Sequence, residues 1–142
     1  MSRVNALFVA LALAVGLWGC SSQPATTAKA VDAHNSRNSL SWAGVYEGVL
    51  PCADCPGIKT RLTLRRDGSY ELVTHYLDRP LPPQTVRGQF AWNAAGGAIT
   101  LDAAGGGQPF MVGEGRLLQL NRDGTPLPAN APTRVLTQVR TD

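Results

Sequence analysis

Polar and apolar side chains alternate with a period of two along much of this chain from residue 42 onward. The alternation is clearest in residues 57–64, 69–77 and 84–92, and turn signals such as Asp67-Gly68 separate these segments. A period of two is that of a β-strand with one buried face and one wet face. No window of adequate length has the periodicity of a helix. The pattern therefore predicts an antiparallel β fold.

Eight short strands are expected, because segments of strand length lie between closely spaced turn signals. They are predicted at residues 42–50, 57–64, 69–77, 84–92, 98–101, 110–112, 116–121 and 133–139. Short connections favour an up-and-down order, and closure into a barrel removes exposed strand edges. We therefore predict an all-β fold, a small antiparallel up-and-down β-barrel, with a β-sandwich as the alternative. Its core aromatic residues are predicted to be Trp42, Tyr46, Phe90 and Trp92.

Residues 1–19 have the pattern of an export signal. Arg3 provides a basic start, and the apolar run of residues 6–18 is shorter than the roughly 20 residues that a membrane-spanning helix needs. Gly19-Cys20 resembles a bacterial lipobox, in which the cysteine is acylated. Ser21, in place of aspartate, resembles the signal for sorting to the outer membrane. We predict a chain anchored by lipid on Cys20 in the outer membrane and facing the periplasm.

The remaining chain divides into a tether and a domain. Residues 20–41 are small and polar, which predicts a flexible tether in which His34 is solvated. Residues 42–142 are enough for one small domain with a single core. The net charge of +3 is spread along the chain and forms no basic block with interleaved aromatic residues. Nucleic acid is therefore not a predicted partner.

Cys52 and Cys55 form a Cys-x-x-Cys pair between Pro51 and Pro56. Two soft ligands at this spacing can hold Cu(I), whereas structural zinc usually takes four protein ligands. A tight turn can also bring the two Cα atoms within the 4.4–6.8 Å that a disulfide requires. Exchange catalysis is disfavoured because no helix follows to stabilise a thiolate. Three interpretations stay open: a disulfide or structural turn, a copper site, and, as the least favoured, exchange catalysis. The first two are compatible, since the reduced pair could bind Cu(I).

Three further side chains, Asp54, His75 and Met111, could assist the cysteine pair, either by shaping its turn or by binding a metal with it. Asp54 is expected to orient the turn through an Asx-type hydrogen bond, and the less favoured alternative is that it lends charge to a bound cation. His75 and Met111 could supply a third metal donor, but we interpret them as a half-exposed strand residue and a core gap-filler. No catalytic triad, carboxylate pair or phosphate loop is present in the sequence, and the chain is not predicted to be an enzyme.

Residues 42–58, with their Leu-Pro-Cys-Ala-Asp-Cys core, closely resemble the N-terminal domain of the NlpE (CutF) family, and residues 88–92 and 118–124 extend the resemblance. The resemblance implies a lipocalin-like barrel in an outer-membrane lipoprotein. It also implies a role in copper tolerance and in envelope stress signalling through a Cpx-type sensor kinase. Longer members carry a second, OB-like domain with its own cysteine pair, so only the N-terminal domain is expected here.

The function expected from these features is copper homeostasis or resistance and envelope stress sensing. Cys52 and Cys55 are the candidate residues for Cu(I) binding or redox sensing, and Cys20 is the candidate for lipidation. The alternative is a lipocalin-like carrier that holds a small apolar ligand inside the barrel.

Overall fold

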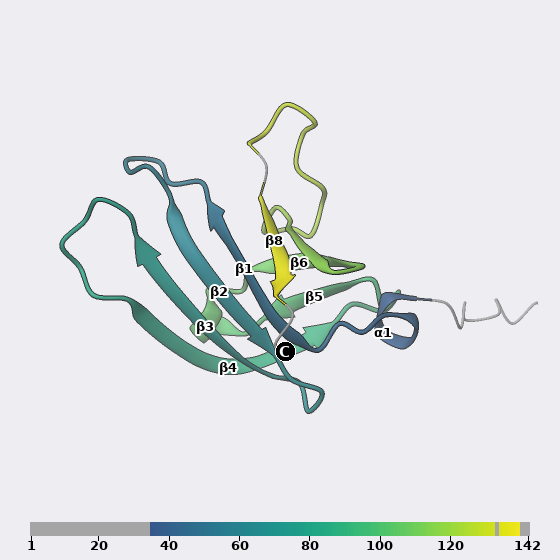
Figure 1. Cartoon of the computed structure of the whole chain (residues 1–142). Coiled ribbons are helices and arrows are strands. Elements are labelled where there is room, and N and C mark those ends of the chain that lie inside the picture. Colours follow the sequence, from purple (N-terminus) through teal and green to yellow (C-terminus); the bar gives the residue numbers. More distant parts are fainter. Residues whose placement is uncertain (1–34, 133, 140–142) are drawn as a thin grey trace, which may run out of the picture. The chain divides into compact units, whose positions relative to one another are not determined.

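The computed structural model describes residues 35–132 and 134–139, which all lie in one compact unit, Val31–Asp142. The predicted leader, Cys20 and His34 lie outside the described residues. Figure 1 shows the elements in chain order: α1 (Ser36–Ser39), β1 (Gly44–Leu50), β2 (Ile58–Leu64), β3 (Ser69–Tyr76), β4 (Gln84–Trp92), β5 (Ala98–Leu101), η1 (Ala103–Gly105), β6 (Pro109–Gly113), β7 (Arg116–Gln119) and β8 (Val135–Val139). No helix in this part of the chain is long and apolar enough to cross a membrane.

The eight strands form a closed barrel in which each strand pairs with the next, and β8 pairs with β1. Every pairing is antiparallel. The all-β up-and-down barrel predicted from the sequence is confirmed, and the β-sandwich alternative is wrong. The backbones pack closely at Gly48 in β1, because a Cβ at this position would lie 2.6 Å from the carbonyl oxygen of Val135, the first residue of β8.

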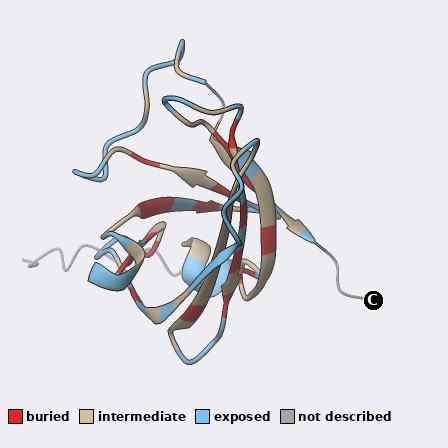
Figure 2. Cartoon of the chain, turned by 90° about the vertical axis from the view of Figure 1, so that its left-hand side faces the viewer, coloured by how far each residue is buried: buried red, intermediate tan, exposed pale blue. Residues whose placement is uncertain are grey.

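The predicted alternation sets the two faces of each strand. Partners across the sheet share a face, as in the row formed by Tyr46, Leu62, Leu72 and Val86. Figure 2 shows buried segments alternating with more exposed ones along the strands. The inward residues form one core, whose members include Tyr46, Leu62, Leu64, Tyr70, Ile99, Leu101, Phe110, Val112, Leu117 and Leu136. Side-chain burial of this extent is the main favourable contribution to folding.

One end of the barrel is filled by three aromatic rings, and we call it the aromatic end. Trp42 packs edge-on against Phe90 and Trp92, with ring centroids 5.8 and 5.3 Å apart. Trp42, Tyr46 and Phe90 are buried as predicted, whereas Trp92 is half-buried. The same end carries α1 and the three tight turns of residues 65–68, 93–97 and 114–115. The opposite end, which we call the loop end, carries loops 51–57, 77–83, 102–108 and 120–132.

The structure corrects the predicted tether boundary at residue 41. Residues 35–41 contain α1, whose first turn is capped by the Asn35 side chain accepting from the Asn38 N–H. The hydroxyl of Ser36 donates to the carbonyl of Val112, and the N–H of Arg37 donates to the carbonyl of Gly96. The segment is therefore attached to the aromatic end. So short a helix has no apolar stripe, which is why periodicity did not reveal it.

Candidate functional site

The Cys-x-x-Cys pair lies in loop 51–57, which joins β1 to β2 at the loop end. Leu50 and Ile58 are paired across the two strands, so this loop closes a hairpin. Pro51 and Pro56 have no N–H to donate and cannot extend the ladder into the loop. The sequence thus ends both strands beside the cysteines.

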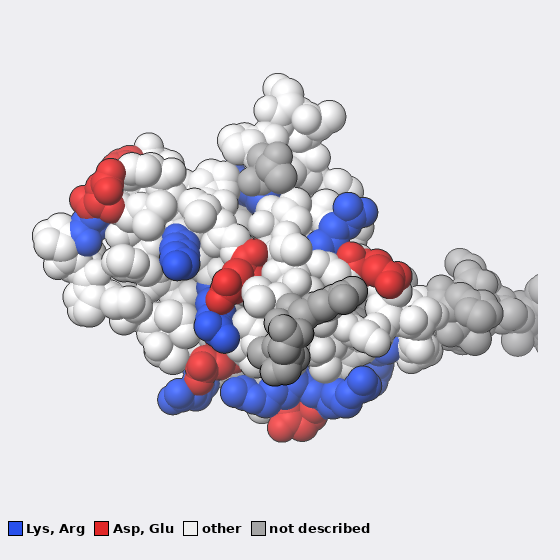
Figure 3. Space-filling view, viewed as in Figure 1, with Lys and Arg blue, Asp and Glu red and all other residues white. Residues whose placement is uncertain are grey.

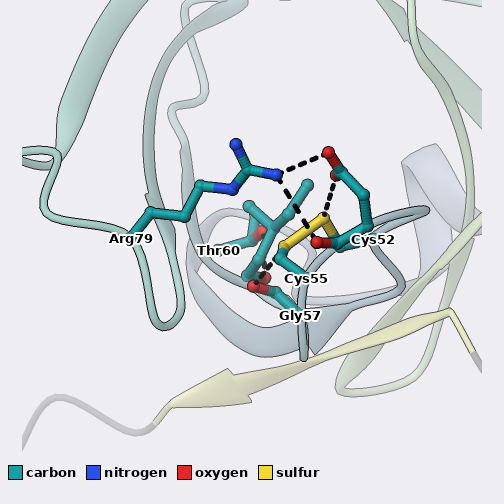
Figure 4. The surroundings of a disulfide bond; sticks show 7 residues. Cys52, Cys55, Gly57, Thr60 and Arg79 are labelled. Carbon is teal, nitrogen blue, oxygen red and sulfur yellow. Dashed lines mark hydrogen bonds and ion pairs between the residues drawn. A yellow bond between two sulfur atoms is a disulfide. The ribbon is translucent and has the colours of Figure 1, made fainter.

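Cys52 and Cys55 form a disulfide, with their Cα atoms 5.3 Å apart (Figure 4). This separation lies within the normal range for bridged cysteines. Both cysteines are half-buried, whereas Ala53, Asp54 and Pro56 between and beside them are exposed. Of the alternatives that the sequence left open, the oxidised form is therefore the one present in the structure.

The disulfide loop is held against the neighbouring loop 77–83. The Sγ of Cys55 lies 3.4 Å from the carbonyl oxygen of Gly57, and this oxygen accepts a hydrogen bond from the N–H of Leu77. Gly57 is buried, and a Cβ there would lie 2.4 Å from a methyl carbon of Val49. The Gly57 carbonyl therefore contacts both the disulfide and loop 77–83. A movement of the disulfide can reach loop 77–83 through this one group.

Asp54 provides a second link between the two loops. Its Oδ2 lies 2.5 Å from Nη2 of Arg79, and its Oδ1 lies 3.5 Å from Sγ of Cys52 (Figure 4). The predicted Asx turn is wrong, because the residue two positions on is Pro56, which has no N–H to donate. The carboxylate binds Arg79 instead. Sequence reasoning missed Arg79, although the order of hairpins places loops 51–57 and 77–83 at the same end.

The ligand atoms of Cys52, Asp54 and Cys55 lie within 4.8 Å of one another. Two sulfurs and one carboxylate suit a soft cation such as Cu(I) only when the cysteines are reduced, because the thiolate is the metal ligand. His75 and Met111 are not part of this group. His75 lines a groove of about 240 Å³ on the outer face of β3, as the half-exposed strand residue predicted. Met111 was predicted in the core but is 39% exposed, because it alternates with the buried Phe110 and Val112 along β6 and so lies on the outer face.

A second polar cluster lies at the loop end around Asp102. Its carboxylate accepts from the Gln89 N–H at 2.9 Å and from the Tyr70 hydroxyl at 2.7 Å. The Gln89 N–H is the main cause of the lowered pKa of Asp102, and the Tyr70 hydroxyl adds to it. Burial, and then the carboxylate, raise the pKa of Tyr70 to about 12. This cluster joins β3, β4 and the segment that follows β5, and we interpret it as structural.

The inside of the barrel is occupied by side chains at its middle. Tyr46, Leu62, Leu117 and Leu136 have 0% exposure. Small eight-stranded barrels are often filled in this way. No observation in the described part of the chain favours the alternative of a carrier for an apolar ligand.

The fold and the site define a small, closed, eight-stranded antiparallel barrel with a disulfide-bridged loop at one end. Residues 46–130 match the sequence model of the NlpE N-terminal domain. The match covers more than half of the chain, and the chain belongs to the NlpE family.

Two named relatives are similar to this chain over shorter stretches. Lipoprotein NlpE of Escherichia coli (strain K12) is 32% identical over 83 residues, which is 58% of this chain and 35% of the relative. The 17 kDa lipoprotein of Treponema pallidum (strain Nichols) is 37% identical over 49 residues, or 34% of this chain and 31% of the relative. The matches thus span about a third of these relatives. Their names support a lipid-anchored membrane location for this chain.

Two solved structures are also similar. A lipoprotein from Shewanella oneidensis aligns with a TM-score of 0.68 and 43% identity, covering 73% of this chain and 94% of that one. The Cpx pathway activator NlpE from Escherichia coli aligns with a TM-score of 0.51 and 28% identity, covering 63% of this chain and 47% of that one.

Proposed function

We propose that this chain is an outer-membrane lipoprotein that faces the periplasm and reports envelope stress to a Cpx-type sensor kinase, with a further role in copper homeostasis. The observation that carries the proposal is the disulfide between Cys52 and Cys55, in a loop tied to its neighbour by Asp54 and Arg79. Membership of the NlpE family supports it, as does the description of an Escherichia coli relative as a Cpx pathway activator. The role is that of a sensor and binder, not of an enzyme.

The redox part of the proposal follows from the geometry of the loop. Two electrons and two protons from an envelope dithiol convert the disulfide into two thiols, and the dithiol becomes oxidised in turn. The loop then loses its covalent closure, and Asp54 becomes free to move relative to Arg79. Loop 77–83 senses this change through Arg79 and through the Leu77 N–H bonded to Gly57. A partner that contacts both loops would distinguish the two states.

The copper part applies to the reduced pair. Cys52 and Cys55 would then supply two thiolate ligands, and Cu(I) accepts a small number of soft donors. Binding releases the thiol protons, so it strengthens as the pH rises. The carboxylate of Asp54 lies beside Cys52 and would add negative charge near a bound cation.

A Cu(I) competition titration tests the copper role. The reduced parent is compared with the Cys52→Ser, Cys55→Ser variant and with a Met111→Leu control, since Met111 lies outside the cluster. We expect one-to-one binding in the parent and in the control, and its loss in the double variant. Equal binding by all three proteins would contradict the assignment of the pair as ligands.

A Cpx-dependent reporter in cells that produce the full chain tests the signalling role. The parent should raise the reporter signal, and the Cys52→Ser, Cys55→Ser variant should hold it at one level whether or not the envelope is under reducing stress. If both proteins respond to that stress alike, the pair is not the sensor. If neither raises the signal, the barrel does not act on this kinase.

A further inference from the structure

Charge is distributed unevenly between the two ends of the barrel. At the aromatic end the described charged residues are four arginines, Arg37, Arg65, Arg66 and Arg116, and two acids, Asp67 and Glu114, a net +2. At the loop end three arginines, Arg79, Arg122 and Arg134, face four aspartates, Asp54, Asp78, Asp102 and Asp123, a net −1. Figure 3 shows several basic side chains, with acidic ones among them, along the lower edge of the molecule.

The arginines of the aromatic end are available to an outside partner. All four are exposed. In the part of the chain that the structure describes, ion pairs join Arg61 to Glu47, Arg79 to Asp54 and Arg87 to Glu71, and none includes an arginine of this end. Exposed cations without an acidic partner raise the local potential toward anions.

Two of these arginines line one hollow. Arg37 on α1 and Arg66 in the turn after β2 border a hollow of about 340 Å³, whose floor includes Trp42, Phe90 and Trp92. Asp67 also lines the hollow, and the hydroxyl and the N–H of Ser69 both donate to one oxygen of its ionised carboxylate. The three charged side chains of the hollow therefore sum to +1. Two guanidinium groups beside a tryptophan edge suit a phosphate group at a lipid–water interface.

The chain also enters the barrel at this end. Asn35, the first described residue, packs on the turn at Gly96, since a Cβ there would lie 2.7 Å from the Asn35 side chain. Cys20, the predicted lipid attachment, is 15 residues earlier, and such a segment can span at most about 50 Å. The basic end is therefore the end of the barrel at which the chain arrives from the predicted lipid anchor.

We propose that the aromatic end docks on an anionic phospholipid surface, with a lipid phosphate between Arg37 and Arg66. The disulfide loop, at the opposite end, then points away from the membrane and toward soluble partners. The inference depends on a membrane location and not on the chemistry of the cysteines. Each arginine near an anionic bilayer adds to the binding affinity. Removal of two arginines should therefore change the affinity measurably.

The test uses a chain that begins at Ser21. Every strand of the closed barrel lies within residues 44–139, so this chain contains the whole fold. It also lacks Trp18, and its tryptophans are Trp42 and Trp92, both at the aromatic end. Tryptophan quenching by nitroxide-labelled lipid therefore reports whether this end contacts the bilayer.

Binding is measured by sedimentation with phosphatidylcholine vesicles, with and without phosphatidylglycerol. We expect salt-sensitive binding to the anionic vesicles, accompanied by tryptophan quenching. Arg37→Gln with Arg66→Gln should weaken binding on the order of tenfold. The matched control, Lys59→Gln with Arg122→Gln, removes the same charge elsewhere and should bind nearly as the parent does.

Three results would overturn the proposal: equal loss in the two double variants, equal binding to neutral vesicles, or binding without quenching. The Cys52→Ser, Cys55→Ser variant should bind vesicles as the parent does. Failure of the cysteine-based function therefore leaves this measurement unchanged, and the two proposals can fail separately.

Discussion

Arg79 and Asp54, which are 25 residues apart, join two loops of the barrel through a contact of 2.5 Å between Nη2 and Oδ2. The pair is exposed, so its contribution to the free energy of unfolding is expected to be below about 1 kcal/mol. Its importance is local. Asp54 also lies 3.5 Å from the sulfur of Cys52, and Arg79 offsets its negative charge there.

The reactivity of the reduced cysteines should respond to the two partners in opposite directions. Arg79→Gln leaves the Asp54 carboxylate uncompensated beside Cys52, which disfavours the thiolate and should slow alkylation of the reduced protein. Asp54→Asn removes that carboxylate and should speed alkylation. The rate of iodoacetamide alkylation at a fixed pH measures both changes. Arg87→Gln, in an ion pair on the outer face of β3 and β4, is the control, and rate changes of the same sign in both test variants would contradict the prediction.

Loss of the disulfide should lower stability modestly. The loop that Cys52 and Cys55 close is very short, so the chain-entropy model gives a loss of about 2 kcal/mol. Urea unfolding of the Cys52→Ser, Cys55→Ser variant measures it. The parent in reducing agent should unfold at nearly the same urea concentration as the variant, and a parent unaffected by reductant would show that the bridge does not constrain the fold.

High pH should destabilise the barrel through its buried tyrosines. The pKa values of Tyr46 and Tyr70 are raised from 10.0 to about 12, mainly by burial, and for Tyr70 also by Asp102. The neutral phenol is favoured in the folded state, so this stability is complete below pH 10 and is lost as the pH rises toward 12. Thermal unfolding of Tyr70→Phe should show a weaker decline over this window than the parent. If the stability of Tyr70→Phe and of the parent fell equally over this pH range, groups other than Tyr70 would be the cause.

Low pH should destabilise the barrel through Asp102, whose carboxylate accepts a hydrogen bond from the Tyr70 hydroxyl. The pKa of Asp102 lies below its usual value of 3.8, because the Gln89 N–H and then the Tyr70 hydroxyl stabilise the carboxylate. The resulting stability is present above pH 3.8 and is lost as the pH falls through the lowered pKa. We expect Asp102→Asn to be less stable than the parent at neutral pH and to lose less on acidification. Circular dichroism during acid titration of both proteins measures this difference.

Gly48→Ala should destabilise the closed barrel. The added methyl carbon would lie 2.6 Å from the Val135 carbonyl oxygen, and this backbone cannot move without disturbing the closing strand pair. We expect a loss of about 1–3 kcal/mol, typical of an overpacked core. Urea unfolding measures it, and Gly97→Ala serves as the control because a Cβ there meets nothing within 4 Å. Gly97→Ala should be neutral or slightly stabilising, because alanine reduces the conformational entropy of the unfolded chain. A similar loss in both variants would show that the close approach to Val135 is not the cause.

The barrel could be predicted because the sequence patterns that specify its strands and turns each lie within a few consecutive residues. Alternation in residues 58–64 and 69–76 depends only on which side chains face the core, and tight turns then fix which strands are neighbours. The helix α1 could not be found in this way, since four residues have no period. Met111 was misplaced because an apolar side chain on the outer face looks the same in sequence as one in the core.

The site was predicted only in part for a related reason. The spacing of Cys52 and Cys55 permits both a disulfide and a metal site, and sequence does not specify the oxidation state. Arg79 is joined to Asp54 only by folding, and no local motif marks it. The Asx turn expected at Asp54 could have been excluded from the sequence, because Pro56 has no N–H.

The pairing of β8 with β1 makes the last strand the one that completes the fold. Tyr46 and Gln138 are register partners although they are 92 positions apart in the sequence. A chain that emerges N-terminus first must keep the edges of β1 and β7 unpaired until residues 135–139 appear, and such long-range pairing is slow. Until then both edges are open to strands from other chains. A product cut short before β8 is therefore a barrel that cannot close, and it is the form of this protein most prone to aggregate.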